Sequence, residues 1–270
     1  MNNLAYSKEL QTAFKAAQEA GNIIDNYSEK GFETERKSDG SKVTEADRKS
    51  QEKIVEVISN EFPDDGFLGE EEHLTPGDED RVWVIDPIDG TFNFSKGFQN
   101  YCVSIALKED DEVIVGVVFS PESSLDKTYF AVRGEGAFTT DAGIDSSEPI
   151  SVSNQSEIED SLFFMSSFDI YEGQLDSELS LLRDFAEKGA IHRQIGSCAL
   201  EMCRVAEGSV GFQLTPIVKE WDYAAAKLIV EEVGGDFRIR DSKFPNCAEV
   251  VCSNGILQEE IEKIVGDKFV

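Results

Sequence analysis

The sequence predicts a fold of two differently built halves, an α+β half followed by an α/β half. Two amphipathic helical stretches open the chain, and a series of closely spaced β-rich segments follows. Beyond about residue 145, helical and β-rich segments alternate. The acidic, Ser-rich stretch 141–148 separates the two patterns. We therefore expect an N-terminal half over residues 1–145 and a C-terminal half over residues 146–270.

Two helices are expected before the first strands. Between residues 4 and 28, apolar side chains recur at helical spacing, and Gly31 follows the stretch. A second amphipathic helix is expected to begin near Thr44 and to end before Pro63, because proline cannot continue a helix. Both helices should lay their apolar faces on a sheet.

The other elements follow from β-rich runs and helical periodicity. In the first half, strands are expected at 82–85, 103–107, 113–119 and 129–132, close enough in sequence to form an antiparallel meander. In the second half, strands and helices should alternate. The expected strands are 162–165, 210–214, 237–239 and 250–253, and the expected helices are 177–187, 197–207, 221–233 and 256–265.

Composition limits the kinds of partner. The chain has 270 residues and a formal net charge of −29, so it should repel nucleic-acid phosphates and have no nucleic-acid partner. No apolar run reaches the roughly 20 residues of a membrane span, and the first ten residues lack the apolar core of a signal peptide. We expect a cytoplasmic protein with no membrane partner. The acidity is typical of a strongly hydrated surface, as in proteins that work in high salt, and salt adaptation is kept as a hypothesis.

The cysteines and histidines form no recognisable motif. The five cysteines include no CxxC pair, which favours buried, reduced thiols that act as small apolar side chains. His73 and His192 are the only histidines in the sequence, so a zinc site is not expected.

One segment carries a pattern typical of metal chemistry. An apolar run that ends at Ile85 leads directly into Asp86 and Asp89, which are three residues apart. Pro87 is expected to end the strand ladder. In the resulting turn both carboxylates and the carbonyl of Ile88 can face one point, which is the oxygen-only donor set that Mg²⁺ prefers.

The next two residues suit a phosphate group. Gly90 has no Cβ, so a ligand can approach its backbone closely. Thr91 offers a hydroxyl and a backbone N–H at the start of a short expected helix, which favours an anion. Taken alone, an Asp-x-x-Asp-Gly turn is usually structural, because these residues are also good turn formers.

Two further acids point to the same chemistry. Glu70 follows the apolar pair Phe67-Leu68 and is the member of the acidic run 70–72 that we expect to turn inward, although such a run most often faces water. Asp222 follows Trp221 at an expected helix start, where it can also serve as an N-cap or first-turn acid.

Read together, these segments resemble the signature motifs of the inositol monophosphatase family, a superfamily of Mg²⁺-dependent, lithium-sensitive phosphatases with fructose-1,6-bisphosphatase-like relatives. The matching segments are Val43-Thr44-Glu45-Ala46-Asp47, Gly69-Glu70-Glu71, Asp86-Pro87-Ile88-Asp89-Gly90-Thr91, Gly196-Ser197, Trp221-Asp222-Tyr223-Ala224-Ala225 and Gly234-Gly235. Their order and spacing match the family from about residue 5 to residue 265.

The resemblance implies a layered αβαβα fold and a phosphatase that commonly forms homodimers. It implies that two or three Mg²⁺ ions are bound by Glu70, Asp86, the carbonyl of Ile88, Asp89 and Asp222. It also implies catalytic roles for Glu70 and Thr91, which would activate water, and for Asp47, which would hydrogen-bond Thr91. The substrate contacts that it implies are Gly90, Thr91, Gly196, Ser197, Thr215 and Asp222.

Elementary chemistry agrees with such a site. Uncatalysed phosphate-ester hydrolysis is extremely slow, and enzymes accelerate it by positioning and charge neutralisation. Bound metal ions acidify a water and stabilise the leaving oxygen, so no histidine, cysteine or serine nucleophile is needed. Bound cations would also explain how so acidic a protein attracts an anionic substrate.

Some positions depart from the family pattern and leave the substrate open. Thr215 stands where many inositol-processing members have a glutamate that contacts substrate hydroxyls, and Ser41 stands where an aspartate is usual. Lys219 could contact a second phosphate, or it could be a solvated loop lysine. Arg36, Lys37 and Lys42 could border the site or form a solvated turn.

We expect hydrolysis of inositol monophosphate or a similar sugar phosphate. The alternatives are fructose 1,6-bisphosphate, histidinol phosphate and 3′-phosphoadenosine 5′-phosphate. A third, different reading is a non-catalytic, metal-binding regulatory protein that kept the fold.

Overall fold

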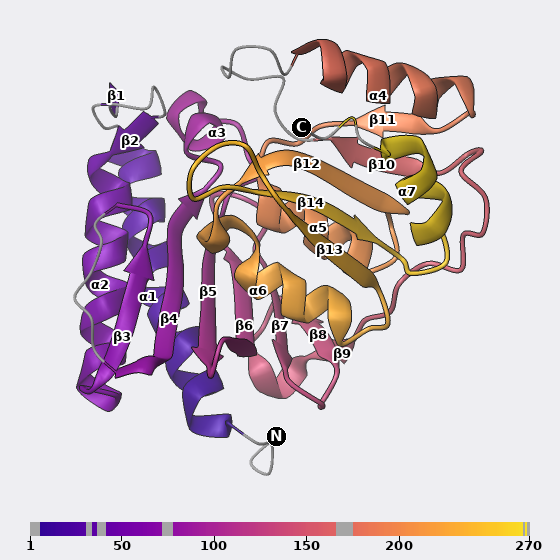
Figure 1. Ribbon diagram of the computed structural model, residues 1–270. Coiled ribbons are helices and arrows are strands. Elements are labelled where there is room, and N and C mark those ends of the chain that lie inside the picture. Colours follow the sequence, from indigo (N-terminus) through magenta and orange to yellow (C-terminus); the bar gives the residue numbers. More distant parts are fainter. Residues whose placement is uncertain are drawn as a thin grey trace.

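The computed structural model describes residues 6–30, 34–36, 42–71, 78–165, 175–266 and 268. Over these residues, seven α-helices and two large sheets form five layers in the order helices, sheet, helices, sheet, helices (Figure 1). The layered αβαβα fold is therefore confirmed. None of the helices in the described ranges combines the length and the apolar composition that a membrane-spanning helix needs.

The first sheet has seven strands in the order β3-β4-β5-β6-β7-β8-β9. Strands β3 and β4 are parallel, and every later pair is antiparallel, which confirms the predicted meander. The strands are β3 Asp65–Gly69, β4 Asp78–Asp89, β5 Cys102–Glu109, β6 Glu112–Ser120, β7 Lys127–Val132, β8 Ala137–Thr140 and β9 Glu148–Pro149.

The second sheet has five strands in the order β11-β10-β12-β14-β13, with parallel pairing around β10 and antiparallel pairing around β14. Its strands are β10 Leu162–Met165, β11 Ile191–Arg193, β12 Phe212–Val218, β13 Asp236–Asp241 and β14 Ala248–Ser253. A separate small sheet pairs β1, Thr34–Arg36, with β2, Lys42–Thr44.

The helices fill the outer and middle layers. They are α1 Ser7–Lys30, α2 Glu45–Glu61, α3 Thr91–Lys96, α4 Leu175–Glu187, α5 Cys198–Ala206, α6 Glu220–Glu231 and α7 Gln258–Val265, with a 3₁₀ turn at Ile144–Ser146. Helix α2 begins where the sequence predicts, because Thr44 caps it and forms a capping box with Asp47.

Three apolar cores hold the layers together. One lies between α1, α2 and the first sheet, a second between the two sheets around α5 and α6, and a third between the second sheet, α4 and α7. Neighbouring residues of β4 show the alternation: Ile85 packs into the first core and Val84 into the second. Because both faces of the first sheet are covered, its central strands are apolar almost throughout.

The middle core joins both halves of the chain. The first sheet ends at Pro149 and the second begins at Leu162, so the change of architecture falls between these residues. The division at residues 145 and 146 stays a prediction.

The prediction that Pro87 ends the strand ladder is wrong. Pairing with β5 continues to Asp86, skips Pro87 and Ile88, and resumes where Asp89 faces Cys102. Proline lacks the N–H that a ladder needs, and a bulge is one place in a sheet where that loss is tolerated. The strand predicted at 82–85 therefore extends over 78–89.

The second sheet repeats this correction. The strand expected at 210–214 lies further along the chain, because β12 covers Phe212–Val218 with a register shift between Thr215 and Val218. Pro216 thus lies in a bulge, like Pro87. The short strands β1, β2, β8, β9 and β11 were not predicted, because their two to four residues give little periodicity to detect.

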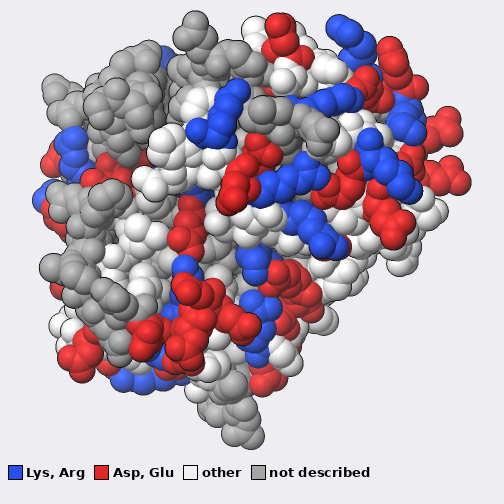
Figure 2. Space-filling model, in the orientation of Figure 1, with Lys and Arg blue, Asp and Glu red and all other residues white. Residues whose placement is uncertain are grey.

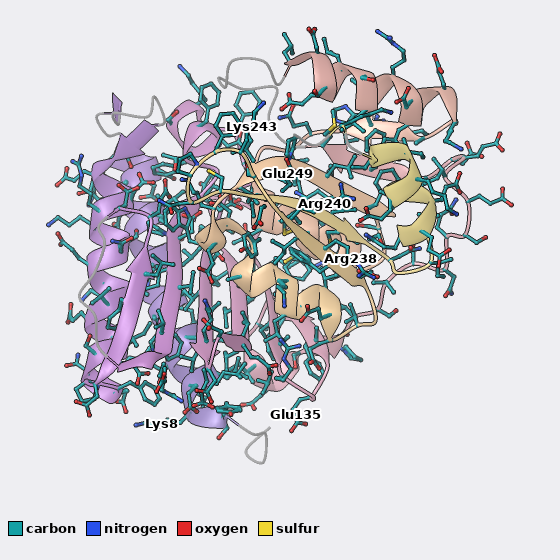
Figure 3. The ribbon with its side chains drawn as sticks, viewed as in Figure 1. Lys8, Glu135, Arg238, Arg240, Lys243 and Glu249 are labelled. Carbon is teal, nitrogen blue, oxygen red and sulfur yellow. The ribbon has the colours of Figure 1, made fainter. Side chains whose placement is uncertain are left out.

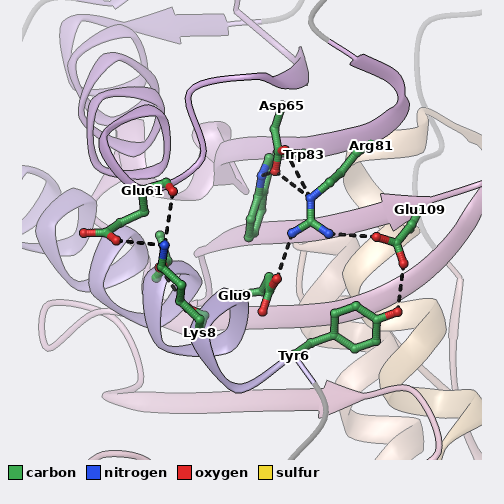
Figure 4. Close-up of polar contacts among 9 residues, drawn as sticks. Tyr6, Lys8, Glu9, Glu61, Asp65, Arg81, Trp83 and Glu109 are labelled. Atoms are coloured by element: carbon green, nitrogen blue, oxygen red, sulfur yellow. Dashed lines mark hydrogen bonds and ion pairs between the residues drawn. The ribbon is translucent and has the colours of Figure 1, made fainter.

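Arg81 organises the end of β4 that lies far from Asp89 (Figure 4). Its guanidinium pairs with Asp65 of β3 at 3.0 Å, with Glu9 of α1 at 2.9 Å and with Glu109 of β5 at 2.8 Å. The Arg81 guanidinium therefore links β4 to α1, β3 and β5, across the first two layers.

Acidic and basic side chains are interspersed on the face that carries β13 (Figure 2). Figure 3 shows Arg238, Arg240 and Lys243 in a row along the β13–β14 hairpin. Arg238 pairs with Asp236 at 2.6 Å, and Arg240 pairs with Glu262 of α7. These pairs neutralise part of the acidic charge on this face.

The five cysteines are free thiols. Three of them are buried, as expected, whereas Cys198 and Cys247 are partly exposed.

Candidate active site

The predicted site residues gather where β3 and β4 end. Because these strands are parallel, their carboxyl ends share one edge of the sheet. Gly69 lies opposite Ile85, and the N–H of Glu70 donates to the carbonyl of Ile85 at 3.2 Å. Glu70 is thereby held beside Asp86, the next residue of β4.

The bulge of β4 shapes the next part of the site. Inside it, the N–H of Ile88 donates to a carboxylate oxygen of Asp86 at 2.9 Å. The chain then turns at Gly90, whose φ of +97° lies in the left-handed region that favours glycine. Thr91 begins α3, so the short helix that the sequence predicts at this residue is confirmed.

Thr91 is tied to α2 and to the bulge. Its hydroxyl lies 3.0 Å from Oδ1 of Asp47 and 2.9 Å from the carbonyl of Ile88. The other oxygen of Asp47 accepts the N–H of Thr44 at 2.7 Å. Asp47 is completely buried, and this burial, together with the charge of Glu70, raises its pKa to about 6 against the opposing hydrogen bonds from Thr44 and Thr91.

Asp86 and Asp222 bring strand β4 and helix α6 together. Their carboxylates lie close enough to interact directly, and Glu70 also lies beside Asp86. Burial, followed by the charges of Glu70, Asp89 and Asp222, raises the pKa of Asp86 well above its ordinary range. Burial and the charges of Asp89 and Glu70 likewise raise the pKa of Asp222.

Asp222 is fixed in place by its own helix. It lies in the first turn of α6 and accepts the N–H of Lys219 at 2.8 Å. The hydroxyl of Ser104, which lies opposite Asp86 in the sheet, donates to the carbonyl of Trp221 at 3.2 Å. The start of α6 is thus anchored on β5 beside Asp86.

These carboxylates are chemically suited to a hard cation. Buried carboxylates that raise one another's pKa are a costly arrangement, which divalent cations relieve. Among the residues that the structure describes, no three Asp, Glu, His or Cys side chains already stand as ligands around one point. The donor set fits Mg²⁺, because hard divalent cations prefer carboxylate and carbonyl oxygens.

Asp89 makes contacts that the sequence analysis missed. Its carboxylate accepts the hydroxyl of Ser197 at 2.6 Å and the N–H groups of Ala199 at 2.7 Å and Cys198 at 3.1 Å, all at the start of α5. Burial raises the pKa of Asp89 to about 6, although these three hydrogen bonds oppose the rise. The Gly196-Ser197 pair, for which the resemblance implies substrate contact, is the sequence signal at this position.

The predicted substrate residues line the same region. A Cβ on Gly90 would lie 3.2 Å from the carbonyl of Gly196, so the two glycines allow α3 and α5 to approach each other. Thr215 of β12 is buried, and its hydroxyl lies 3.8 Å from the sulfur of Cys198. The contact between Cys198 and Thr215 therefore carries no formal charge.

Other candidates lie elsewhere. The side-chain ammonium of Lys219 lies 3.5 Å from the carbonyl of Pro245, on the β13–β14 hairpin. His192 packs its ring 5.2 Å from that of Phe163, beside the third apolar core. Ser41, Lys37 and His73 lie outside the described residues, as do the side chains of Arg36 and Lys42.

The sequence profile of the inositol monophosphatase family matches residues 5–268. The chain therefore belongs to the inositol monophosphatase family. Its relatives carry several names. It is 35% identical to a protein of Pasteurella multocida named Nus factor SuhB, over 96% of this chain and 98% of the relative. It is also 35% identical to a fructose-1,6-bisphosphatase/inositol-1-monophosphatase of Thermotoga maritima, over 83% and 82%. A histidinol-phosphatase of Mycobacterium tuberculosis is 34% identical over 83% and 85%.

Solved structures support the same fold. The extragenic suppressor protein suhB of Bartonella henselae superimposes with a TM-score of 0.86 at 26% identity, over 96% of this chain and 99% of that one. The family and the fold are thus fixed, whereas the names of the relatives differ in substrate and in role.

Proposed function

We propose that this protein is a Mg²⁺-dependent phosphatase that hydrolyses a small phosphate monoester with a metal-activated water. The observation that carries the proposal is the close approach of Asp86 and Asp222, which are far apart in sequence and form a partly buried carboxylate cluster with Glu70. Buried acids of one sign are typical of sites that hold divalent cations.

The residues that would hold two or three Mg²⁺ ions are Glu70, Asp86, Asp89 and Asp222, with the carbonyl of Ile88. When bound, Mg²⁺ supplies positive charge that offsets these carboxylates, acidifies a water and stabilises the leaving oxygen. Oδ2 of Asp89 accepts two hydrogen bonds, from Ser197 and Ala199, whereas Oδ1 accepts one, from Cys198, and so keeps a lone pair for a cation.

Thr91 and Asp47 would orient the attacking water. The single hydroxyl proton of Thr91 is directed toward Asp47 and the carbonyl of Ile88, which leaves the oxygen's lone pairs to accept a hydrogen bond from the water. Asp47, with a pKa of about 6, is a carboxylate that can receive a proton near neutral pH. Glu70 shares in activating that water.

The substrate end of the site favours a compact, neutral alcohol. The N–H groups of Gly90 and Thr91 would hold the phosphate, while Gly196, Ser197, Thr215 and Asp222 would surround the alcohol. We propose inositol monophosphate or a similar sugar phosphate, as the Thermotoga maritima relative's name supports. Because Thr215 brings no charge, fructose 1,6-bisphosphate, histidinol phosphate and 3′-phosphoadenosine 5′-phosphate belong in the same substrate panel.

The decisive experiment compares Glu70→Gln with Glu71→Gln, which removes a neighbouring carboxylate from the same segment. Hydrolysis of a general phosphate ester is measured with Mg²⁺ and after chelation by EDTA. We expect Glu70→Gln to lower the rate at least about a hundredfold, the size of effect seen when one electrostatic group of a site is lost. Glu71→Gln should stay close to wild type, and EDTA should abolish the activity reversibly.

A wild-type protein that binds Mg²⁺ but hydrolyses no member of the panel would contradict the proposal. That result would favour a non-catalytic, metal-binding regulatory role, which the name of the Pasteurella multocida relative makes the second candidate. Equal rates for wild type and Glu70→Gln would also count against catalysis at this site.

A further inference from the structure

The turn that precedes α5 is held by a buried acid that the proposed mechanism does not use. Glu201 is completely buried in the middle layer. Its Oε1 accepts the N–H of Ile195 at 2.9 Å and that of Gly196 at 3.2 Å. Its Oε2 accepts the side-chain amide of Gln213, in β12, at 3.2 Å. A buried carboxylate is costly unless such hydrogen bonds offset its desolvation.

The same turn is held from the opposite side by Asn93 of α3. The amide nitrogen of Asn93 donates to the carbonyl of Ile195 at 2.7 Å and to that of Asn100 at 2.8 Å. Glu201 thus binds the N–H side of the Ile195–Gly196 turn, and Asn93 binds its carbonyl side. We call these two side chains and the turn between them the 195–196 clamp.

There is no spare room in the clamp. Gly196 has a φ of +78°, and a Cβ added to it would lie 3.1 Å from the amide nitrogen of Asn93. A Cβ added to Gly90 would lie 3.2 Å from the carbonyl of Gly196. A small shift of the turn would therefore also displace the Gly90–Thr91 segment.

The clamp also sets where α5 begins. Ser197, Cys198 and Ala199 follow the turn immediately, and their hydroxyl and N–H groups are the donors that hold Asp89. An acid that only capped α5 would reach back to the N–H of its N-cap residue, Ser197. Glu201 reaches past it to two N–H groups outside the helix.

We propose that Glu201 is a positioning residue, which through the 195–196 clamp holds the start of α5, and with it the donors to the Asp89 carboxylate, in a fixed position against the Asp89–Thr91 segment. This inference rests on the proposed function, in which Asp89 is a metal ligand and Gly90 and Thr91 hold phosphate. Glu201 itself touches neither group. It acts by holding the hydroxyl and N–H groups that donate to Asp89 in place beside the bulge of β4.

The test compares Glu201→Leu with Glu201→Gln. Leucine removes both acceptors, whereas glutamine keeps one oxygen for the two N–H groups, and Gln213 can turn its amide oxygen toward the new NH₂ group. Glu207→Leu is the matched control, since Glu207 is a largely buried acid at the other end of α5 that binds Lys127 and Tyr129. Each variant is assayed for Mn²⁺ affinity by electron paramagnetic resonance and for amide hydrogen exchange in residues 194–200.

We expect Glu201→Leu to weaken Mn²⁺ binding about tenfold or more, as losses behind a metal ligand usually do, and to speed exchange at Ile195 and Gly196. Glu201→Gln should stay within about threefold of wild type, because the hydrogen bonds are kept. Glu207→Leu should lower the melting temperature but leave Mn²⁺ affinity and this exchange unchanged.

Wild-type Mn²⁺ affinity in Glu201→Leu would overturn the inference. So would an equal loss in Glu207→Leu, because the effect would then be general destabilisation. If the wild type binds Mn²⁺ without hydrolysing esters, the proposed function fails, while these affinities still judge the positioning role. If the wild type binds no Mn²⁺, the proposed function fails and the exchange data alone decide whether Glu201 holds the turn.

Discussion

The hydroxyl of Ser197 lies 2.6 Å from a carboxylate oxygen of Asp89 and joins α5 to the end of β4. Both residues are buried, so the hydrogen bond is shielded from water. It is also charge-assisted, which places it among the stronger hydrogen bonds of a protein. This contact links the first sheet to the middle helical layer at the candidate active site.

Ser197→Ala should lower the free energy of unfolding by about 1.5–3 kcal/mol, because it removes a buried donor to a charged group. Urea unfolding monitored by circular dichroism measures this difference. Ser156→Ala is the matched control, since Ser156 is exposed, and it should change stability by less than about 0.5 kcal/mol. Equal effects of the two substitutions would show that the Asp89 contact contributes nothing.

Thr91→Val should lower the hydrolysis rate about a hundredfold or more and leave Mn²⁺ affinity nearly unchanged, because only the group that orients the water is lost. Valine keeps the shape of the side chain without the hydroxyl that binds Asp47. Steady-state kinetics and Mn²⁺ titration provide the measurements.

Thr139→Val serves as control for Thr91→Val. Thr139 lies in β8, and its hydroxyl bonds only a neighbouring strand's carbonyl, at Thr128. Its rate should match wild type. A Thr91→Val enzyme with normal kcat would contradict the role given to this hydroxyl.

Arg81→Met should destabilise the protein by about 3–5 kcal/mol, because three acids would lose their shared, largely buried cation. Differential scanning calorimetry would show a lower melting temperature. Arg238→Met is the control: Arg238 is 59% exposed and pairs only with nearby Asp236, so it should change stability by at most about 1 kcal/mol. A stable Arg81→Met protein would mean that the network in Figure 4 is dispensable.

Glu207 should make stability depend on acid pH. Burial alone would raise its pKa, but hydrogen bonds from Lys127, Arg204 and Tyr129 outweigh burial and lower it to about 2 from its ordinary 4.5. Because the folded pKa is depressed, the stabilisation is complete above pH 4.5 and is lost as the pH falls toward about 2.

Melting temperatures of wild type and Glu207→Gln test this dependence across pH 2–7. The difference between them should be largest near neutrality and shrink below pH 4.5. A difference that is independent of pH would show that the carboxylate's charge is not involved.

The net charge of −29 predicts that salt stabilises the fold. Raising NaCl from about 0.1 M to 1 M shortens the Debye length from about 10 Å to about 3 Å, which weakens repulsion among exposed acids. Urea midpoints in both buffers measure the effect, with KCl as a check for a specific sodium effect. A lower midpoint in high salt would contradict the screening argument and the salt-adaptation hypothesis.

Much of the fold could be predicted because local sequence patterns indicate many of its helices and strands. The capping box of Thr44 and Asp47 marks the start of α2, and the apolar run Leu162–Met165 is strand β10 residue for residue. The predicted strand bounds were wrong where tertiary contacts allow a strand to continue beyond a proline. Pro87 and Pro216 do break the ladder, but each lies in a bulge, after which its strand continues.

For the candidate site, too, some features follow from local sequence and others from tertiary contacts. The sequence by itself determined which chemical groups are present, since carboxylates beside an Asp-x-x-Asp-Gly-Thr turn can be recognised without coordinates. Only the tertiary structure decided that Asp86 meets Asp222, that Asp89 is held by the start of α5, and that Glu201 reaches the turn before that helix. Donor and acceptor types are local properties of the chain. Which of them pair depends on how two sheets pack about a shared core, and no short stretch of sequence contains that information.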